Sequence, residues 1–204
     1  MTDRTAVDFW FDPVCPWAWM TSRWIVEVAR QRDIEVHWHI MSLAILNEGD
    51  EGRDEAHRRA HEAGFRLGLV VAAVDAELGN GKTAELYEAL GRRIHLERRG
   101  PGDPDLLAEA CAEVGVPTEL VERGLAGEYE QAYRASHAEG IGRVGQDVGT
   151  PIIAVNGVAF FGPVISPAPK GEQALRLFDG VVMAAEYDGF FELKRSRTRG
   201  PRFE

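Results

Sequence analysis

Cysteine is scarce in this sequence of 204 residues, which contains only Cys15 and Cys111. Two cysteines cannot form the disulfide framework that stabilises many small secreted domains. Long apolar runs are also missing: no segment approaches the ~20 apolar residues of a membrane span, and the first residues lack the apolar core of a signal peptide. We therefore expect a cytoplasmic protein without a membrane partner, whose thiols serve chemistry rather than structure.

Lysine is rare as well, and acidic residues outnumber basic ones, which gives a net charge of -10. This excess of negative charge repels a phosphate backbone and argues against nucleic acid as a partner. Basic side chains gather between Lys194 and Arg202, which we interpret as a solvated segment. With 45% hydrophobic residues, the chain can bury one core, or a core and an inserted subdomain.

The first forty residues predict a strand, a helix and a second strand. Val7–Phe11 is a short apolar run typical of a buried strand, and Pro16 is well placed in the first turn of a helix. Apolar residues recur at helical spacing from Trp17 to Val28. Ile34–Ile40 then alternates between apolar and polar residues, as a strand with one buried face does. This order begins a parallel α/β unit.

The middle of the chain is helical in pattern, and strand signals return after Gly149. Residues 152–155 and 158–161 are apolar runs joined by Asn-Gly, the strongest hairpin signal in the sequence. Residues 171–186 predict a last amphipathic helix. We therefore predict an α/β thioredoxin fold, with a mixed four-stranded sheet flanked by helices and an inserted all-helical subdomain. Residues 1–48 and 145–204 would form the thioredoxin-like domain, and 49–144 the insertion.

Cys15 stands where the first predicted strand passes into the first helix. Unpaired N–H groups and the positive end of the helix dipole lie at such a position and favour a thiolate. We therefore expect the pKa of Cys15 to fall from its usual ~8.5 to below neutrality, which would make this thiol the nucleophile. The alternative is a cysteine that merely packs at a helix start. Cys111 lies in an apolar helical pattern and is expected in the core.

Thr150-Pro151, directly before a predicted strand, is the second signal. Thioredoxin-like oxidoreductases keep a cis-proline at this point of the fold, facing the reactive cysteine, and this sequence resembles them in both positions. Thr150 would then present its backbone to a substrate beside the sulfur; the alternative is an ordinary trans-proline at a strand start. We predict no metal site, because His57 and His61 have helical spacing but lack a third ligand.

The resemblance extends over nearly the whole chain and points to the actinobacterial DsbA-like family of mycothiol-dependent nitroreductases. The resemblance implies mycothiol as a cosubstrate, and it implies a homodimer. Glutathione is the alternative cosubstrate, because the residues alone do not exclude it. It also implies a cleft near the thiol with contributions from Pro16, Trp17, Asn47 and His95, together with a mycoredoxin or thioredoxin as a further reductant. The segments that carry it are Phe9–Pro13, Cys15–Trp17, Thr21–Trp24, Met41–Asn47, Gly149–Pro151, Val155–Pro163 and Phe190–Arg195.

Ala18 departs from the family pattern, because the family has a second, resolving cysteine at the fourth position of Cys-Pro-Trp-Cys. Without that thiol, Cys15 can form a mixed disulfide that a second small thiol releases. The chain is then a natural monothiol enzyme, an engineered resolving-cysteine mutant, or a relative that lost redox activity. We predict a thiol-dependent oxidoreductase that uses Cys15 in thiol–disulfide exchange or in mycothiol-dependent reduction of small electrophiles. The alternatives are a kappa-type thiol transferase or isomerase and a redox-inactive binding module.

Overall fold

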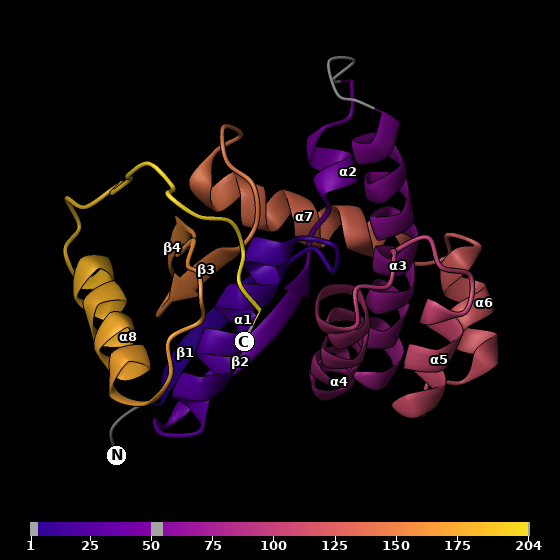
Figure 1. Cartoon of the computed structure of the whole chain (residues 1–204), viewed down its shortest axis with the longest axis horizontal. Coiled ribbons are helices and arrows are strands. Elements are labelled where there is room, and N and C mark those ends of the chain that lie inside the picture. The colour runs from indigo at the N-terminus through magenta and orange to yellow at the C-terminus, as the bar shows by residue number, and fades with distance from the viewer. Residues whose placement is uncertain (1–3, 50–54, 204) are drawn as a thin grey trace.

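A mixed sheet of four strands forms the centre of the protein in the computed structural model, which describes residues 4–49 and 55–203 (Figure 1). The strands are β1 (Thr5–Phe11), β2 (Ile34–Ile40), β3 (Ile152–Val155) and β4 (Val158–Phe161), in the order β2-β1-β3-β4. β1 runs parallel to β2 and antiparallel to β3, and β3 pairs antiparallel with β4. The predicted thioredoxin-type sheet is therefore confirmed, with the two halves of the sequence meeting between β1 and β3.

The turn between β3 and β4 follows the Asn-Gly signal. Asn156 has φ 49° and Gly157 has φ 89°, so both central residues adopt the left-handed conformation that a tight two-residue hairpin requires. Val155 and Val158 pair on either side of the turn. The Asn156 side chain also accepts a hydrogen bond from the backbone N–H of Ala6, which ties the turn to the start of β1.

Helices cover both faces of the sheet. α1 (Pro16–Ala29) and α8 (Gly171–Glu186) contact each other on one face, and α7 (Glu130–Val144) contacts β2, β3 and β4 from the other. β1 is therefore buried on both sides: Phe9 and Phe11 belong to the main core, while Trp10 packs in a second cluster with Ile141 and Ile152. A strand buried on both faces needs the continuous apolar run that the sequence shows.

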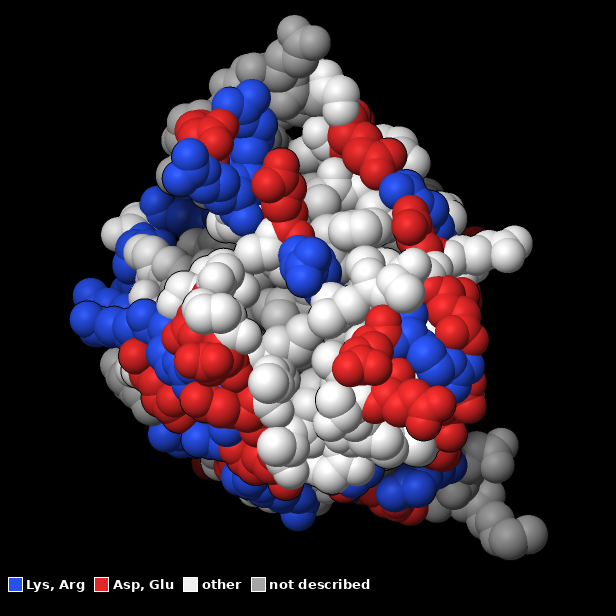
Figure 2. Space-filling view, turned by 90° about the vertical axis from the view of Figure 1, so that its right-hand side faces the viewer, with Lys and Arg blue, Asp and Glu red and all other residues white. Residues whose placement is uncertain are grey.

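A block of helices lies to one side of the sheet in Figure 1. All described elements between β2 and α7 are helical, as predicted. They are α2 (Leu43–Leu46), α3 (Glu55–Leu78), α4 (Asn80–Gly91), the π-helix η1 (Arg92–Leu96), α5 (Leu106–Glu113) and α6 (Thr118–Leu125). Acidic and basic side chains intermingle on the outer face of this block (Figure 2). Among the described residues, no helix has both the length and the apolar character to cross a bilayer.

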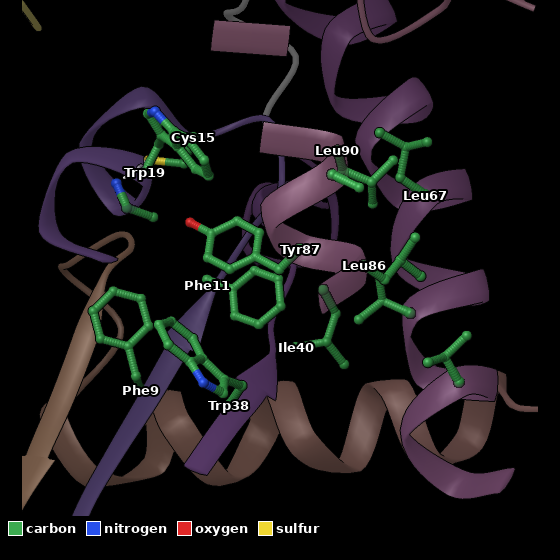
Figure 3. Close-up of a cluster of buried hydrophobic side chains, with 14 of the residues drawn as sticks. Phe9, Phe11, Cys15, Trp19, Trp38, Ile40, Leu67, Leu86, Tyr87 and Leu90 are labelled. Carbon is green, nitrogen blue, oxygen red and sulfur yellow. Dashed lines mark hydrogen bonds between the residues drawn. The ribbon is translucent and has the colours of Figure 1, made fainter. Parts of the chain in front are cut away.

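The block is joined to the sheet by aromatic packing near the end of β1 (Figure 3). Tyr87 of α4 stacks on Phe11 with ring centroids 3.7 Å apart and also contacts Trp38 of β2 and Trp19 of α1. Its hydroxyl points to the end of the cluster where Cys15 and Trp19 lie. The helical block thus reaches the point at which β1 passes into α1.

Candidate functional site

Cys15 is the N-cap residue of α1, and Pro16 is the first helical residue. Its backbone N–H donates to the carbonyl of Asp12 at 3.0 Å, which closes a tight turn after β1. The sulfur accepts a hydrogen bond from the N–H of Ala18 at 3.4 Å. The prediction that this cysteine would meet unpaired amides at a helix start is therefore confirmed. The amide belongs to Ala18, the residue that replaces the resolving cysteine of the family pattern.

Thr150 lies opposite this sulfur. The Cys15 thiol donates to the carbonyl oxygen of Thr150 at 3.4 Å, and the Thr150 hydroxyl donates to the carbonyl of Trp10 at 3.3 Å. The Thr150–Pro151 peptide bond is cis. The fold thus brings together the two sequence signals on which the site prediction depends, although the two lie in different halves of the chain.

The prediction of a lowered pKa for Cys15 is wrong for this conformation of the protein. The residue is only 5% exposed, and burial raises the pKa of the thiol to about 12. The amide of Ala18 and the charge of Arg197 oppose this shift, whereas the nearby charge of Asp12 adds to it. Loss of hydration disfavours the thiolate more than one helix terminus favours it. The structure therefore holds Cys15 as a neutral hydrogen-bond donor.

Asp12 is a site residue that the sequence analysis treated only as a strand-breaking residue of the motif. Its carboxylate is 1% exposed and accepts hydrogen bonds from the N–H groups of Val14 at 2.9 Å and Leu43 at 2.7 Å. Burial raises its pKa to about 6, against the effect of those two bonds. Asp12 therefore joins the cysteine turn to the start of α2. A carboxylate three residues before a cysteine at a strand end was the available signal.

His95 is buried beside the cysteine turn. Its Nε2 lies 3.0 Å from the carbonyl oxygen of Pro13 and donates to it, and its ring stacks on Trp19 at 5.6 Å. Burial lowers its pKa to about 4, so the ring is neutral at physiological pH. On its other side, Phe203 lies with its centroid 5.6 Å from the His95 ring. His95 is therefore a buried residue beside the cysteine turn and not a surface histidine.

The side chains of the other predicted residues have their contacts away from the sulfur. Trp17 is half-buried, and the guanidinium of Arg197 lies 5.1 Å from its ring centroid. Asn47 ends α2, where its side-chain amide donates to the carbonyl of Leu43. Cys111 is 2% exposed in the core of the helical block, as expected. The side chain of His57 lies outside the described residues, and the described part contains no cluster of three potential metal ligands.

A pocket of about 830 Å³ opens beside the cysteine turn. One wall comes from the residues on either side of Cys15, a second from η1 and the loop after it, and a third from residues 201–203. Basic, apolar and aromatic side chains form the walls. The lining residues are Val14, Pro16, Ile94, His95, Leu96, Arg98, Pro201, Arg202 and Phe203.

Comparison with known proteins agrees with this geometry. Residues 14–195 match the model of the Rv2466c-like family, described as mycothiol-dependent nitroreductase Rv2466c. The chain belongs to this family. The uncharacterized protein Rv2286c of Mycobacterium tuberculosis is 30% identical over 195 residues, which cover 95% of this chain and 83% of that protein.

Solved structures share the fold at lower sequence identity. The oxidoreductase DsbA of Xylella fastidiosa superposes with a TM-score of 0.55 at 22% identity, over 91% of this chain and 88% of that one. The cytosolic disulfide reductase DsbM of Pseudomonas aeruginosa gives a TM-score of 0.60 at 18% identity, over 87% of this chain and 99% of that one. Family membership and this DsbA-like fold together support a thiol oxidoreductase.

Proposed function

We propose that this protein is a monothiol oxidoreductase in which Cys15 is the nucleophile of thiol–disulfide exchange. The observation that carries the proposal is the placement of the Cys15 sulfur between the amide of Ala18 and the carbonyl of Thr150. An N–H group aimed at the sulfur stabilises the thiolate that forms before attack, and again when Cys15 leaves the mixed disulfide. The backbone around Thr150 and Pro151 positions the group that is attacked.

The proposed cycle has two exchange steps. The Cys15 thiol loses its proton, and the thiolate attacks one sulfur of a small disulfide, forming a mixed disulfide and expelling the other sulfur as a thiolate. A second small thiol then attacks the mixed disulfide through its own thiolate, which forms a new disulfide and returns Cys15 to the reduced state. The described chain offers no neighbouring thiol at position 18, so the second step depends on this external thiol.

Deprotonation is the demanding step, because the resting site keeps Cys15 neutral. Asp12 is a buried carboxylate whose charge acts on the sulfur, and its pKa of about 6 leaves it ionised at neutral pH. In this proposal Asp12 accepts the thiol proton as substrate binds, and the amide of Ala18 and the charge of Arg197 stabilise the thiolate that results.

Mycothiol is the proposed external thiol, and the family supports this choice. The same chemistry would reduce small electrophiles, with mycothiol as the final electron donor and a mycoredoxin or thioredoxin as an alternative reductant. Glutathione meets the same chemical requirement, since the cycle needs only a free small thiol. A cytoplasmic location and a homodimer fit this role and are part of the proposal.

A second candidate is thiol transfer of the kappa type, and the raised pKa of Cys15 favours it. In that reaction Cys15 would stay protonated and donate a hydrogen bond to the sulfur of a bound thiol cosubstrate, which would attack an electrophile itself. A serine hydroxyl could replace Cys15 as such a donor, whereas it could not form a mixed disulfide.

The two candidates are separated by measuring disulfide reduction and thiol conjugation, with mycothiol as the thiol, for the wild type and for Cys15→Ser and Cys111→Ser. The oxidoreductase predicts that Cys15→Ser abolishes disulfide reduction, while Cys111→Ser, the same change at a core cysteine, retains it. Conjugation that persists in Cys15→Ser, with no disulfide reduction in the wild type, would establish the transferase instead.

A further inference from the structure

We infer that the pocket beside the cysteine turn binds a small apolar or aromatic substrate that carries a carboxylate, and that Arg98 and Arg202 recognise this carboxylate. The inference rests on the proposed function, because it names the kind of molecule that would present its disulfide or electrophilic group to Cys15. The inference depends on the charges of the lining side chains, on the ion pairs and hydrogen bonds that hold the lining segments in place, and on the chemistry of the lining side chains.

Arg98 and Arg202 are the arginines among the described residues that line this pocket. The neighbouring Arg92, Arg93 and Arg99 each form ion pairs with glutamate or aspartate side chains of the same region. Within residues 4–49 and 55–203, neither Arg98 nor Arg202 has a carboxylate partner. In a protein with a net charge of -10, two unpaired guanidinium groups on one pocket indicate an anionic ligand.

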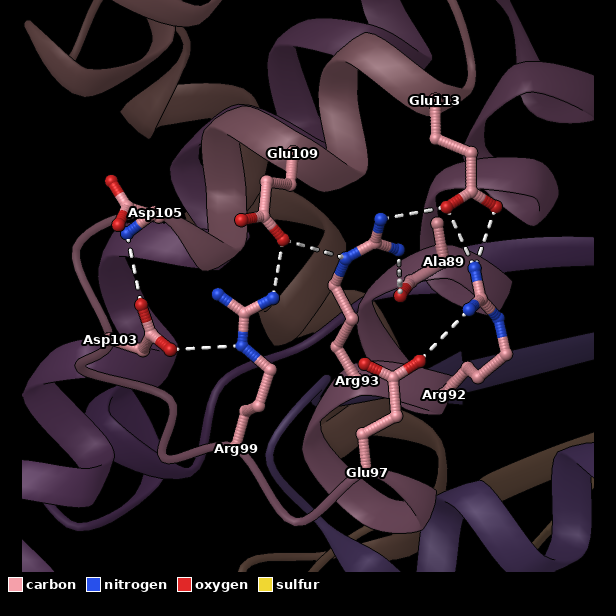
Figure 4. A network of polar contacts seen from close by, with 9 residues as sticks. All are labelled: Ala89, Arg92, Arg93, Glu97, Arg99, Asp103, Asp105, Glu109 and Glu113. Carbon is pink, nitrogen blue, oxygen red and sulfur yellow. Dashed lines mark hydrogen bonds and ion pairs between the residues drawn. The ribbon is translucent and has the colours of Figure 1, made fainter.

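The wall that carries Arg98 is held by a network of ion pairs (Figure 4). Arg93 of η1 contacts Glu113 and Glu109 of α5, and Arg99 contacts Glu109 and also donates to Asp103 at 2.9 Å. Arg98 itself has φ 58°, a left-handed conformation that is unfavourable for a residue with a side chain. The paired residues on either side therefore hold Arg98 in the turn that places it on the pocket.

The wall that carries Arg202 is held by Ser166. The Ser166 hydroxyl donates to the carbonyl of Gly200 at 2.8 Å and accepts from the N–H of Arg202 at 2.9 Å. Phe203 then lies against His95. This segment has no helix or strand of its own, so these contacts are what place Arg202 and Phe203 in the pocket.

The lining chemistry specifies the ligand. A guanidinium binds a carboxylate through two parallel hydrogen bonds, a geometry that lysine cannot provide. Phe203, Pro16 and Ile94 offer apolar surface, and His95 is neutral at physiological pH. Among the described lining residues there is no Asp or Glu to oppose an anion. A carboxylate on a small apolar or aromatic body satisfies both parts of the pocket.

The test measures affinity for para-(methylthio)benzoate and for its methyl ester by calorimetry. The ester lacks the negative charge and carries one added methyl group, and neither probe contains a disulfide that Cys15 could exchange with. We expect wild-type protein to bind the acid about fivefold more tightly than the ester. The double variant Arg98→Gln with Arg202→Gln should lose this preference and keep its affinity for the ester. Arg199→Gln, which removes one positive charge in the same segment outside the pocket lining, should behave as wild type.

Equal affinity of the wild type for acid and ester overturns the inference, and so does an acid preference that survives in the double variant or disappears in Arg199→Gln. Far-ultraviolet circular dichroism and the melting temperature of each variant check that the fold is intact. Because the probes do not react with Cys15, this result is independent of the nucleophile. An inert Cys15 together with a clear preference for the acid would remove the proposed function and leave an anion-binding pocket.

Discussion

The Cys15 sulfur donates a hydrogen bond to the carbonyl oxygen of Thr150 at 3.4 Å across a separation of 135 residues. The contact is made because β1 and β3 are adjacent antiparallel strands, so that the turn after β1 meets the residue before β3. A thiol that donates to a buried carbonyl is held in its neutral form. The resting state and the reacting state of this site therefore differ by one proton.

The first prediction concerns the reactivity of Cys15 in the absence of substrate. With a pKa of about 12, only a minute fraction is thiolate at neutral pH. The rate of alkylation by iodoacetamide should therefore rise roughly tenfold per pH unit from about pH 7 to pH 10. Peptide mass spectrometry identifies the labelled cysteine, and Cys15→Ser is the control. A rate that levels off near pH 7 would contradict the neutral thiol.

The second prediction concerns Asp12 and the pH dependence of stability. Its pKa is higher in the folded protein than in the unfolded chain, so the folded state loses stability as pH rises from about 4 to above about 6. Relative to Asp12→Asn, the free energy of unfolding of the wild type should fall by about 3 kcal/mol across this range.

Urea unfolding of the two proteins at several pH values measures this difference. Asp188→Asn, at an exposed position, is the matched control and should follow the wild type. Parallel curves for the wild type and Asp12→Asn would show that the Asp12 carboxyl has the same pKa in the folded and unfolded states.

The third prediction concerns the contact between α4 and the cysteine helix. A Cβ atom on Gly91 would lie 2.2 Å from the Trp19 ring, which is buried and supports His95. Gly91→Ala should therefore lower the free energy of unfolding by about 1–3 kcal/mol, as overpacking of a core does. Gly81→Ala in the same helix meets no atom within 4 Å and should raise stability by up to ~1 kcal/mol. Equal effects of the two changes would contradict this packing.

The individual strands, the hairpin and the start of the first helix were predictable because each depends on local sequence. Asn156-Gly157 specifies its own turn, and Cys15-Pro16 marks its own helix start. The pairing of Cys15 with Thr150 was predictable only through resemblance to a known fold, since no local pattern joins two segments so far apart. The division into 1–48, 49–144 and 145–204 stays a prediction, although α7 packs on the sheet.

The pKa of Cys15 was not predictable in the same way. The effect of the helix start can be read from the residues around position 15, but the loss of hydration depends on the whole surrounding structure. The pocket was not predictable from local sequence either, because Arg98 and Arg202 come from two distant segments that the fold brings together. Sequence patterns located the thiol, and the packing around it determines its chemistry.

Trapping of a mixed disulfide on Cys15 tests the central claim most directly. Protein treated with a small aromatic disulfide is analysed by intact mass, with Cys15→Ser, Cys111→Ser and Ala18→Cys as variants. We predict one stable adduct on Cys15 in the wild type and in Cys111→Ser, released by mycothiol. We predict no adduct in Cys15→Ser, and an adduct that collapses to an internal disulfide in Ala18→Cys. A wild-type protein that forms no adduct on Cys15, or forms one only on Cys111, would contradict the account.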